Sequence, residues 1–163
     1  KEHSQGLIGS EFLGLKVRPG KTNIRGIRNE NLTDLSFEPN TIDKILSFDC
    51  FEHIADYKTA LLECNRVLRT GGSMLCSVPF HRGSAHNIVR ATVLDNGEIQ
   101  HHTEPEYHGD PLSSQGCLSY YTFGWEFLDD LREAGFSTVY AALIWSDIFG
   151  YLGNEQIAFV ATK

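Results

Sequence analysis

One central segment constrains the fold of this chain more than any other, because it alternates between the hydrophobic patterns of strands and of a helix. An apolar run over residues 42–48 predicts a largely buried strand. Asp56 is a suitable N-cap for a helix through Arg69, and the Gly-Gly pair at residues 71–72 offers the positive φ angles of a helix C-cap. Residues 73–79 then predict a second buried strand. Strand–helix–strand units have right-handed crossovers and build parallel sheets, so the expected fold class is α/β.

The remaining elements are predicted from shorter patterns. In chain order, we expect a weak strand over residues 6–9 ending at Ser10–Glu11, a strand over 22–28, a hairpin of 88–94 and 98–102 around Asn96-Gly97, a helix over 123–134 closed by Gly135, and antiparallel strands over 136–145 and 155–162 at one edge of the sheet. The 163 residues are 41% hydrophobic, which suits one packed core. We therefore predict a single domain over residues 1–163, with a polar insert at 80–116.

Charge and composition narrow the class of protein. The formal net charge is -7, so we expect no general attraction to nucleic acid or to an anionic membrane. No apolar run reaches the roughly 20 residues that span a bilayer, and the four cysteines form no C-x-x-C pair. We predict a soluble, cytoplasmic protein with reduced thiols. The sequence begins with Lys1 rather than methionine, so it need not be a complete gene product.

Five short motifs occur in a specific order. They are N-L-T-D-L-S-F at residues 31–37, the strand at 42–47, the pair Glu52-His53, the helix end E-C-N-R-V-L-R-T-G-G at 63–72, and Val78-Pro79. Together they resemble the middle of a class I S-adenosylmethionine (SAM)-dependent methyltransferase of the type 11 family. The resemblance implies a Rossmann-like fold, methyl-transfer activity and SAM as the cofactor.

The resemblance has a gap at its N-terminal end. Family members begin with a strand and a glycine-rich turn that lets the backbone approach the cofactor closely, and neither precedes Gly6 here. If residues 7–11 correspond to the family's second strand, the first strand and its helix are missing. We therefore expect an incomplete fold that binds SAM weakly or not at all. The uncovered sheet edge would favour a homo-oligomer.

The resemblance also implies a set of cofactor-binding residues. Glu11 falls where the family places the acceptor for the ribose hydroxyls, although an ordinary solvated charge is an equal alternative. Asn31, with Leu32 as its apolar partner, falls where the adenine amino group is bound, and its alternative role is a local Asx-turn. Ser47 and Asp49 lie at the carboxyl end of a predicted strand, where α/β sheets bind ligands.

Histidines are the candidates for catalysis. His81 follows the strand that ends at Pro79, and imidazole is a suitable general base near neutral pH. His108 lies in the insert, which we expect to cover the substrate, whereas Glu52-His53 is expected to organise the following helix. Other metal-ligand types gather in the insert: His101, His102, Glu104, Glu106 and Asp110. We predict no metal site, because Pro105 interrupts them and no H-E-x-x-H helix is present.

Three functions remain open from the sequence. The first is a SAM-dependent methyltransferase acting on a small molecule or metabolite. The second is a truncated or non-catalytic domain that keeps the scaffold and no longer binds SAM. The third is a metal-dependent hydrolase that uses the insert. The substrate itself has no signature in the sequence.

Overall fold

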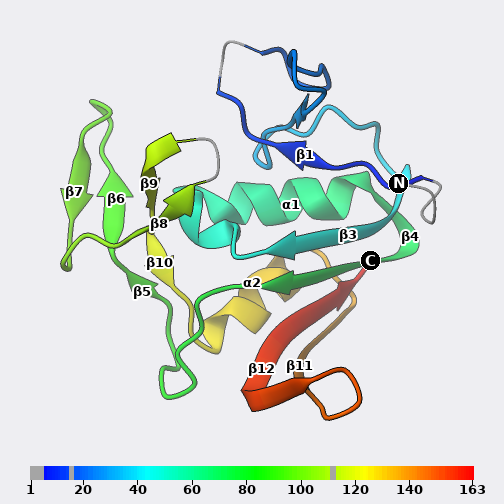
Figure 1. Ribbon diagram of the computed structural model, residues 1–163, viewed down its shortest axis with the longest axis vertical. Helices are drawn as coiled ribbons and strands as arrows, with labels where there is room; N and C mark the ends of the chain where they lie inside the picture. Colours follow the sequence, from blue (N-terminus) through cyan, green and yellow to red (C-terminus); the bar gives the residue numbers. More distant parts are fainter. Residues whose placement is uncertain (1–5, 15–16, 111–112) are drawn as a thin grey trace.

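The computed structural model describes residues 6–14, 17–110 and 113–163 (Figure 1). Its elements are β1 (Ser10–Glu11), β2 (Arg28–Asn29), β3 (Ile42–Phe48), the 3₁₀ helix η1 (Phe51–His53), α1 (Tyr57–Val67), β4 (Leu68–Ser77), β5 (Ile88–Val89), β6 (Ala91–Val93), β7 (Ile99–His101), β8 (Tyr107–Asp110), β9 (Ser113–Leu118), β10 (Tyr121–Thr122), α2 (Glu126–Glu133), β11 (Thr138–Ser146) and β12 (Tyr151–Thr162). The α/β class is confirmed.

Four strands form the central sheet, in the order β11–β12–β4–β3. β3 and β4 are parallel and are joined by α1, as the strand–helix–strand pattern predicts. β12 pairs antiparallel with both β4 and β11, which confirms the predicted antiparallel pair at one edge. The carboxyl ends of β3 and β4 consequently meet at the same edge of the sheet.

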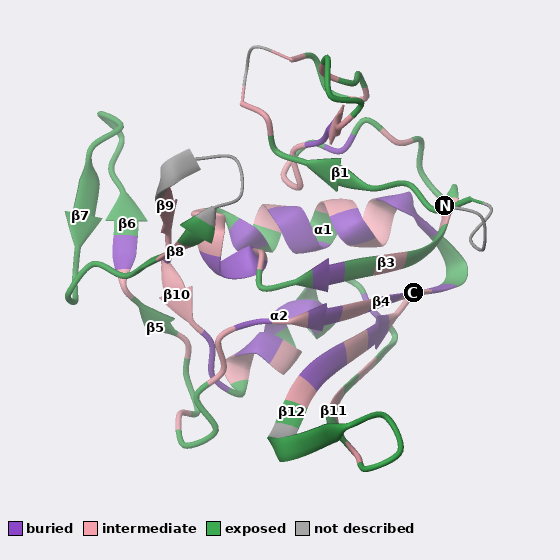
Figure 2. Cartoon of the chain, in the orientation of Figure 1, coloured by how far each residue is buried: buried purple, intermediate pink, exposed green. Residues whose placement is uncertain are grey.

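The hydrophobic core lies between one face of this sheet and the two helices (Figure 2). Met74 and Cys76 project from β4 toward Leu61 and Cys64 of α1, and Phe127 of α2 joins the same cluster. The rings of Phe51, Tyr57, Phe123 and Phe159 surround that of Phe127, with centroids 4.7 to 6.5 Å away. No helix in the described ranges is both long and apolar enough to cross a membrane.

Helix α1 begins as predicted and ends earlier than predicted. The Asp56 side chain accepts a hydrogen bond from the backbone N–H of Thr59 at 3.1 Å, which confirms the N-cap. The helix stops at Val67, and Leu68 is already extended at the start of β4. The Gly-Gly pair at residues 71–72 therefore lies within a strand, and its predicted role as a helix C-cap is wrong.

The two glycines instead permit a close approach of backbones. The N–H of Gly71 donates to the carbonyl of Lys163, and the N–H of Lys163 donates to the carbonyl of Gly72, each at 3.0 Å. A Cβ atom at Gly72 would lie 2.8 Å from the carbonyl oxygen of Arg69. A side chain there would force the backbone apart, because non-bonded carbon and oxygen atoms do not approach so closely.

Two other expectations from the sequence are corrected. Residues 23–27 form a turn, and of the strand predicted over 22–28 only Arg28 lies in a strand, β2, because the Asn23 side chain accepts hydrogen bonds from the N–H groups of Arg25 and Ile27. The strand at 42–48 is present as β3 but is not largely buried, since Leu46 and Phe48 are 60% and 57% exposed. β3 is also an edge strand of the sheet within the described part of the chain, so one row of its backbone N–H and C=O groups has no partner strand in this sheet.

The insert folds as a series of small hairpins beside η1 and the N-terminal end of α1 (Figure 1). β6 and β7 pair antiparallel around the turn at Asn96-Gly97, as predicted. β5 pairs with β10, and β8 pairs with β9. The N–H of Tyr120 donates to the carbonyl of Glu52 at 2.7 Å, so the end of the insert is joined to the segment after β3.

The aromatic cluster predicts a large effect of truncation at its centre. We expect Phe127→Ala to lower the free energy of unfolding by about 3–5 kcal/mol, because it removes a fully buried ring and leaves a cavity. Leu62→Ala on the exposed side of α1 is the control and should cost less than about 1 kcal/mol. Urea unfolding followed by circular dichroism measures both. Equal losses in the two variants would show that the cluster is not the centre of the core.

Candidate functional site

The carboxyl ends of β3 and β4 are joined by side chains as well as by the sheet. The N–H of Asp49 donates to the carbonyl of Ser77 at 3.1 Å, and the Ser77 hydroxyl donates to Asp49 Oδ1 at 3.0 Å. Asp49 has a φ of 48°, which turns the chain sharply after β3. Its side chain is exposed at the edge, whereas Ser47, two residues earlier, is buried. Of this predicted pair, only Asp49 faces solvent.

A pocket of about 250 Å³ opens at this edge. It is lined by side chains and backbone from the ends of β3 and β4, the segment after β4, and β12: Asp49, Ser77, Val78, Phe80, Arg82, Gln156 and Ile157. Both signs of charge and apolar surface are therefore available at the carboxyl edge. Ligands of open α/β sheets bind at this edge.

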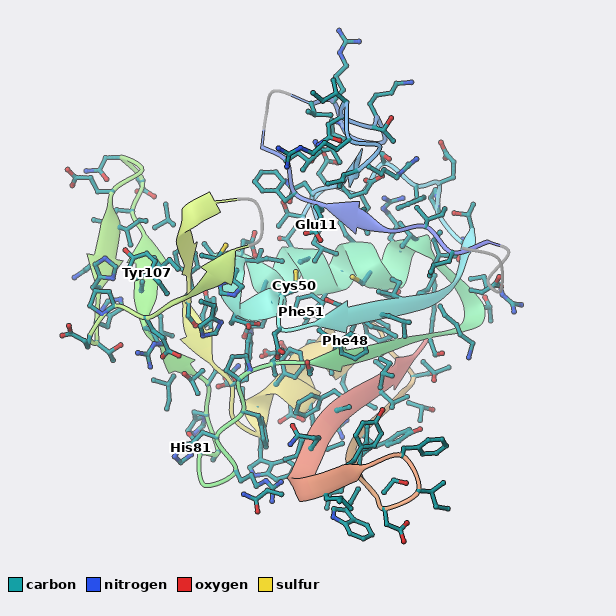
Figure 3. The ribbon with its side chains drawn as sticks, viewed as in Figure 1. Glu11, Phe48, Cys50, Phe51, His81 and Tyr107 are labelled. Atoms are coloured by element: carbon teal, nitrogen blue, oxygen red, sulfur yellow. The ribbon has the colours of Figure 1, made fainter. Side chains whose placement is uncertain are left out.

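Glu11 lies near the same edge, on a separate pair of strands. β1 and β2 are parallel, and the N–H of Glu30 donates to the carbonyl of Glu11 at 3.1 Å. The Glu11 side chain is exposed and lies on the side of β1 that faces Cys50 (Figure 3). Burial, followed by the carboxylates of Glu52 and Glu11, raises the pKa of the Cys50 thiol to about 11. Glu11 therefore acts electrostatically on the segment after β3.

The chain after β2 is fixed by two local networks. Asn31 Oδ1 accepts hydrogen bonds from the N–H and the hydroxyl of Thr33, at 3.1 and 2.9 Å, which is the Asx-turn considered as its alternative role. Leu32 is half-buried and packs against the core. Glu30 is a buried carboxylate that binds Arg28 and Ser36, a role that the sequence analysis missed. Cofactor contacts of Asn31 and Leu32 remain predictions.

The two candidate catalytic histidines do not share one site. The side chain of His81 is exposed, and its backbone N–H donates to the carbonyl of Phe123 at 2.8 Å. Figure 3 shows it at the opposite end of the insert from Tyr107, the neighbour of His108. His108 instead lies beside Glu106, with Nε2 3.1 Å from Glu106 Oε1. His81 is flanked by Phe80 and Arg82, which line the pocket.

Glu52 is the residue whose environment the sequence analysis least anticipated. Its carboxyl group is fully buried in η1, and burial is the main cause that raises its pKa to about 7. His53 and His108 each place a ring nitrogen 3.6 Å from Glu52 Oε1. Among the other insert residues considered as metal ligands, His101, His102 and Glu104 are exposed, and the side chain of Asp110 lies outside the described residues. The pair Glu52-His53 could be recognised in the sequence, whereas its proximity to His108 could not.

A buried polar network anchors the start of the insert. Tyr57 of α1 and Asn87 of the insert both donate to Asp130 Oδ2 of α2, at 2.7 and 2.8 Å. The N–H of Gly124 donates to Asn87 Oδ1 at 2.9 Å, and Lys58 Nζ lies 2.7 Å from Asp130 Oδ1. Burial and the hydrogen bond to Asp130 raise the pKa of Tyr57, so its hydroxyl stays a donor. The insert is therefore tied to both helices of the core.

Comparison with known proteins identifies this architecture. Residues 14–76, which run from the segment after β1 into β4, match the methyltransferase domain family. Over these residues the chain is similar to that family. The chain also superposes on the crystal structure of an S-adenosylmethionine dependent methyltransferase from Mesorhizobium loti, with a TM-score of 0.51 and 14% identity over 85% of this chain and 70% of that one. The fold is thus the Rossmann-like fold of class I methyltransferases, and the resemblance stated from the motifs is confirmed.

Two relatives match in sequence. A probable S-adenosylmethionine-dependent methyltransferase of Mycolicibacterium smegmatis is 40% identical over 53 residues, which are 32% of this chain and 21% of the relative. The glycine/sarcosine/dimethylglycine N-methyltransferase of Actinopolyspora halophila is 24% identical over 138 residues, 83% of this chain and 24% of the relative. The methyltransferase-like chain thus spans about a fifth to a quarter of the length of these relatives.

The anchor of the insert gives a testable result. We expect Asn87→Ala to speed hydrogen exchange in residues 88–102 about tenfold or more, because it leaves the buried Asp130 with one hydrogen bond fewer. Asn154→Ala, at an exposed position of β12 outside the insert, is the matched control and should leave exchange in residues 88–102 unchanged. Mass spectrometry of the exchanged peptides measures both. Unchanged exchange in Asn87→Ala would show that the network does not hold the insert.

Proposed function

We propose that this methyltransferase domain binds SAM and transfers its methyl group to a small molecule. The observation that carries the proposal is the gathering of polar side chains at the carboxyl edge of a class I fold, with Glu11 at the end of β1, Asp49 after β3 and Ser77 at the end of β4. Ribose hydroxyls need acceptors, and the exposed carboxylate of Glu11 is acceptor-only when ionised. The available residues therefore fit the sugar portion of the cofactor.

Each of the predicted site residues has a proposed task. Glu11 binds the ribose hydroxyls, and Asn31 with Leu32 holds the adenine. Asp49 contacts the ligand from the turn after β3. The buried Ser47, at the end of β3, stabilises that turn. SAM supplies an electrophilic methyl group when bound, so the protein's work is to align donor and acceptor. His81 takes up the proton if the methyl group is transferred to a hydroxyl group. His108 contacts the substrate from the insert.

The pocket and the charge favour a small acceptor. The pocket of about 250 Å³ has room for a small acceptor, and the net charge of -7 disfavours nucleic acid. A cytoplasmic location fits the thiols of Cys50, Cys64 and Cys76, which form no disulfide. The N-methyltransferase of Actinopolyspora halophila acts on glycine derivatives by its name, which is consistent with an acceptor of this size.

One observation favours the alternative of a domain that has lost SAM binding. Asn31 Oδ1 already accepts two hydrogen bonds from Thr33, so it has no lone pair left for the adenine amino group unless Thr33 moves. In that case the fold serves as a scaffold without a cofactor. Binding measurements separate the two functions directly.

Calorimetric titration of the chain with SAM and with S-adenosylhomocysteine is the decisive test. We expect weak binding, and we expect Glu11→Gln to weaken it further by about tenfold or more, because the substitution removes a charge-assisted acceptor. Glu98→Gln in the exposed hairpin is the matched control and should bind like the unmodified chain. No binding of either compound by the folded chain would favour the scaffold function. Equal affinity in Glu11→Gln would remove Glu11 from the site.

We also propose a homo-oligomer assembled through the edge strand β3. Leu46 and Phe48 expose apolar surface on this strand, and open strand edges pair with other chains. We expect light scattering to show a dimer or larger species whose proportion rises with concentration. Leu46→Lys should shift the population to monomer, whereas Leu143→Lys, on the opposite edge strand β11, should not. A monomer at every concentration would contradict the assembly.

A further inference from the structure

The fully buried carboxylate of Glu52 requires a partner. Its side chain is 0% exposed, and neither of its oxygens accepts a hydrogen bond from any residue that the structure describes. Burying a carboxylate without hydrogen bonds is strongly unfavourable, and buried charges in proteins are paired or coordinate metals. The Glu52 carboxylate is therefore a strong hydrogen-bond acceptor that has no donor among the described residues.

Two histidines face the same oxygen of Glu52 from different segments. His53 Nε2 and His108 Nδ1 each lie 3.6 Å from Glu52 Oε1, which is too long for a good hydrogen bond. The two rings stand edge to face, with centroids 4.8 Å apart and an interplanar angle of 88°. The three candidate ligand atoms all lie within 4.8 Å of one another.

The hydrogen bond made by the other nitrogen of each ring determines which ring nitrogen bears the proton. His53 Nδ1 lies 2.8 Å from the carbonyl of Leu118, which only accepts, so Nδ1 carries the proton and donates it. His108 Nε2 lies 3.1 Å from Glu106 Oε1, where an N–H donor is again required. In the neutral rings, the nitrogens that face Glu52 are then lone-pair donors. A carboxylate and two imidazole nitrogens with lone pairs are ligand types that a divalent cation binds together.

We propose that Glu52, His53 and His108 bind a divalent metal ion, with zinc as the preferred ion. Ligand atoms about 2.0–2.1 Å from a tetrahedral zinc lie about 3.4 Å apart, so the two 3.6 Å spacings require a small inward movement, and the two histidine nitrogens, which lie within 4.8 Å of each other, move together by up to a larger amount. Glu106 and the Leu118 carbonyl act as the outer partners that orient metal-bound histidines. Two imidazoles and one carboxylate disfavour Mg²⁺ and Ca²⁺, which prefer oxygen ligands.

The three ligands leave a fourth tetrahedral position for water. They also join the insert to the core, since His108 belongs to β8 and the other two to η1 at the end of β3. A bound ion therefore fixes the insert at a second point, away from the anchor at Asn87. Metal binding is independent of the proposed methyl transfer, because it requires neither SAM nor a methyl acceptor.

The test uses the whole chain, freed of metal by a chelator and checked for folding by circular dichroism. Titration with ZnCl₂ in a calorimeter should give one ion per chain with a dissociation constant in the micromolar range or tighter. Cobalt(II) should give the visible absorption of a tetrahedral complex, and zinc should raise the melting temperature. Absence of zinc binding by the folded chain at micromolar concentrations would overturn the proposal.

Variants locate the ion. Glu52→Gln keeps the size of the buried side chain, and we expect it to weaken zinc binding at least tenfold and to abolish the rise in melting temperature. His108→Ala should do the same. His102→Ala, an exposed histidine of the insert outside the cluster, is the matched control and should bind zinc normally. Unchanged affinity in Glu52→Gln and His108→Ala, or loss of binding in His102→Ala alone, would place the ion elsewhere and refute the site.

Discussion

The parallel pairing of β3 with β4 across α1 is the constraint on which the other features depend. It brings two carboxyl strand ends to one edge, where the Asp49–Ser77 hydrogen bonds join them. The same pairing aligns Met74 and Cys76 with the buried side of α1, so the packing of the helix and the position of the site have a common cause. Antiparallel β12 then closes the pocket from the other side of β4. A shift of one residue in β4 would exchange its buried and exposed side chains.

Features set by near neighbours in the chain could be predicted from the sequence, whereas features set by distant pairing could not. The N-cap at Asp56 depends on a residue three positions away, and the β6–β7 hairpin depends on its own Asn-Gly turn. The Gly-Gly pair at residues 71–72 was assigned to a helix end because its partner is the C-terminal Lys163, which no local pattern reveals. Asn23 likewise converts an alternating pattern into a turn through its side chain.

The candidate site divides in the same way. The polar residues that follow strands, such as Asp49, were predictable because parallel strands end at a common edge. The meeting of Glu52 with His108 depends on how the insert folds back through β8 and β9, and composition alone suggested a different set of ligands. Grouping His81 with His108 rested on their shared chemistry and proximity to one edge, but the hairpins hold them apart (Figure 3). Where an insert separates candidate residues, the residue types of a site can thus be predicted more reliably than which of those residues lie together.

The insert is held at two places that differ in physical character. At Asn87, a buried network with Tyr57 and Asp130 has its hydrogen bonds satisfied, so this end is fixed by the chain's own groups. At Glu52, the corresponding acceptor is buried but lacks hydrogen bonds within the described residues, and the histidines beside it are too distant to supply them. Burying a polar group without hydrogen bonds lowers the stability of the fold, and such a group is retained where binding of an additional ligand compensates for that loss. The unequal satisfaction of these two anchors therefore points to the Glu52 end, rather than the Asn87 end, as the one whose geometry depends on what is bound.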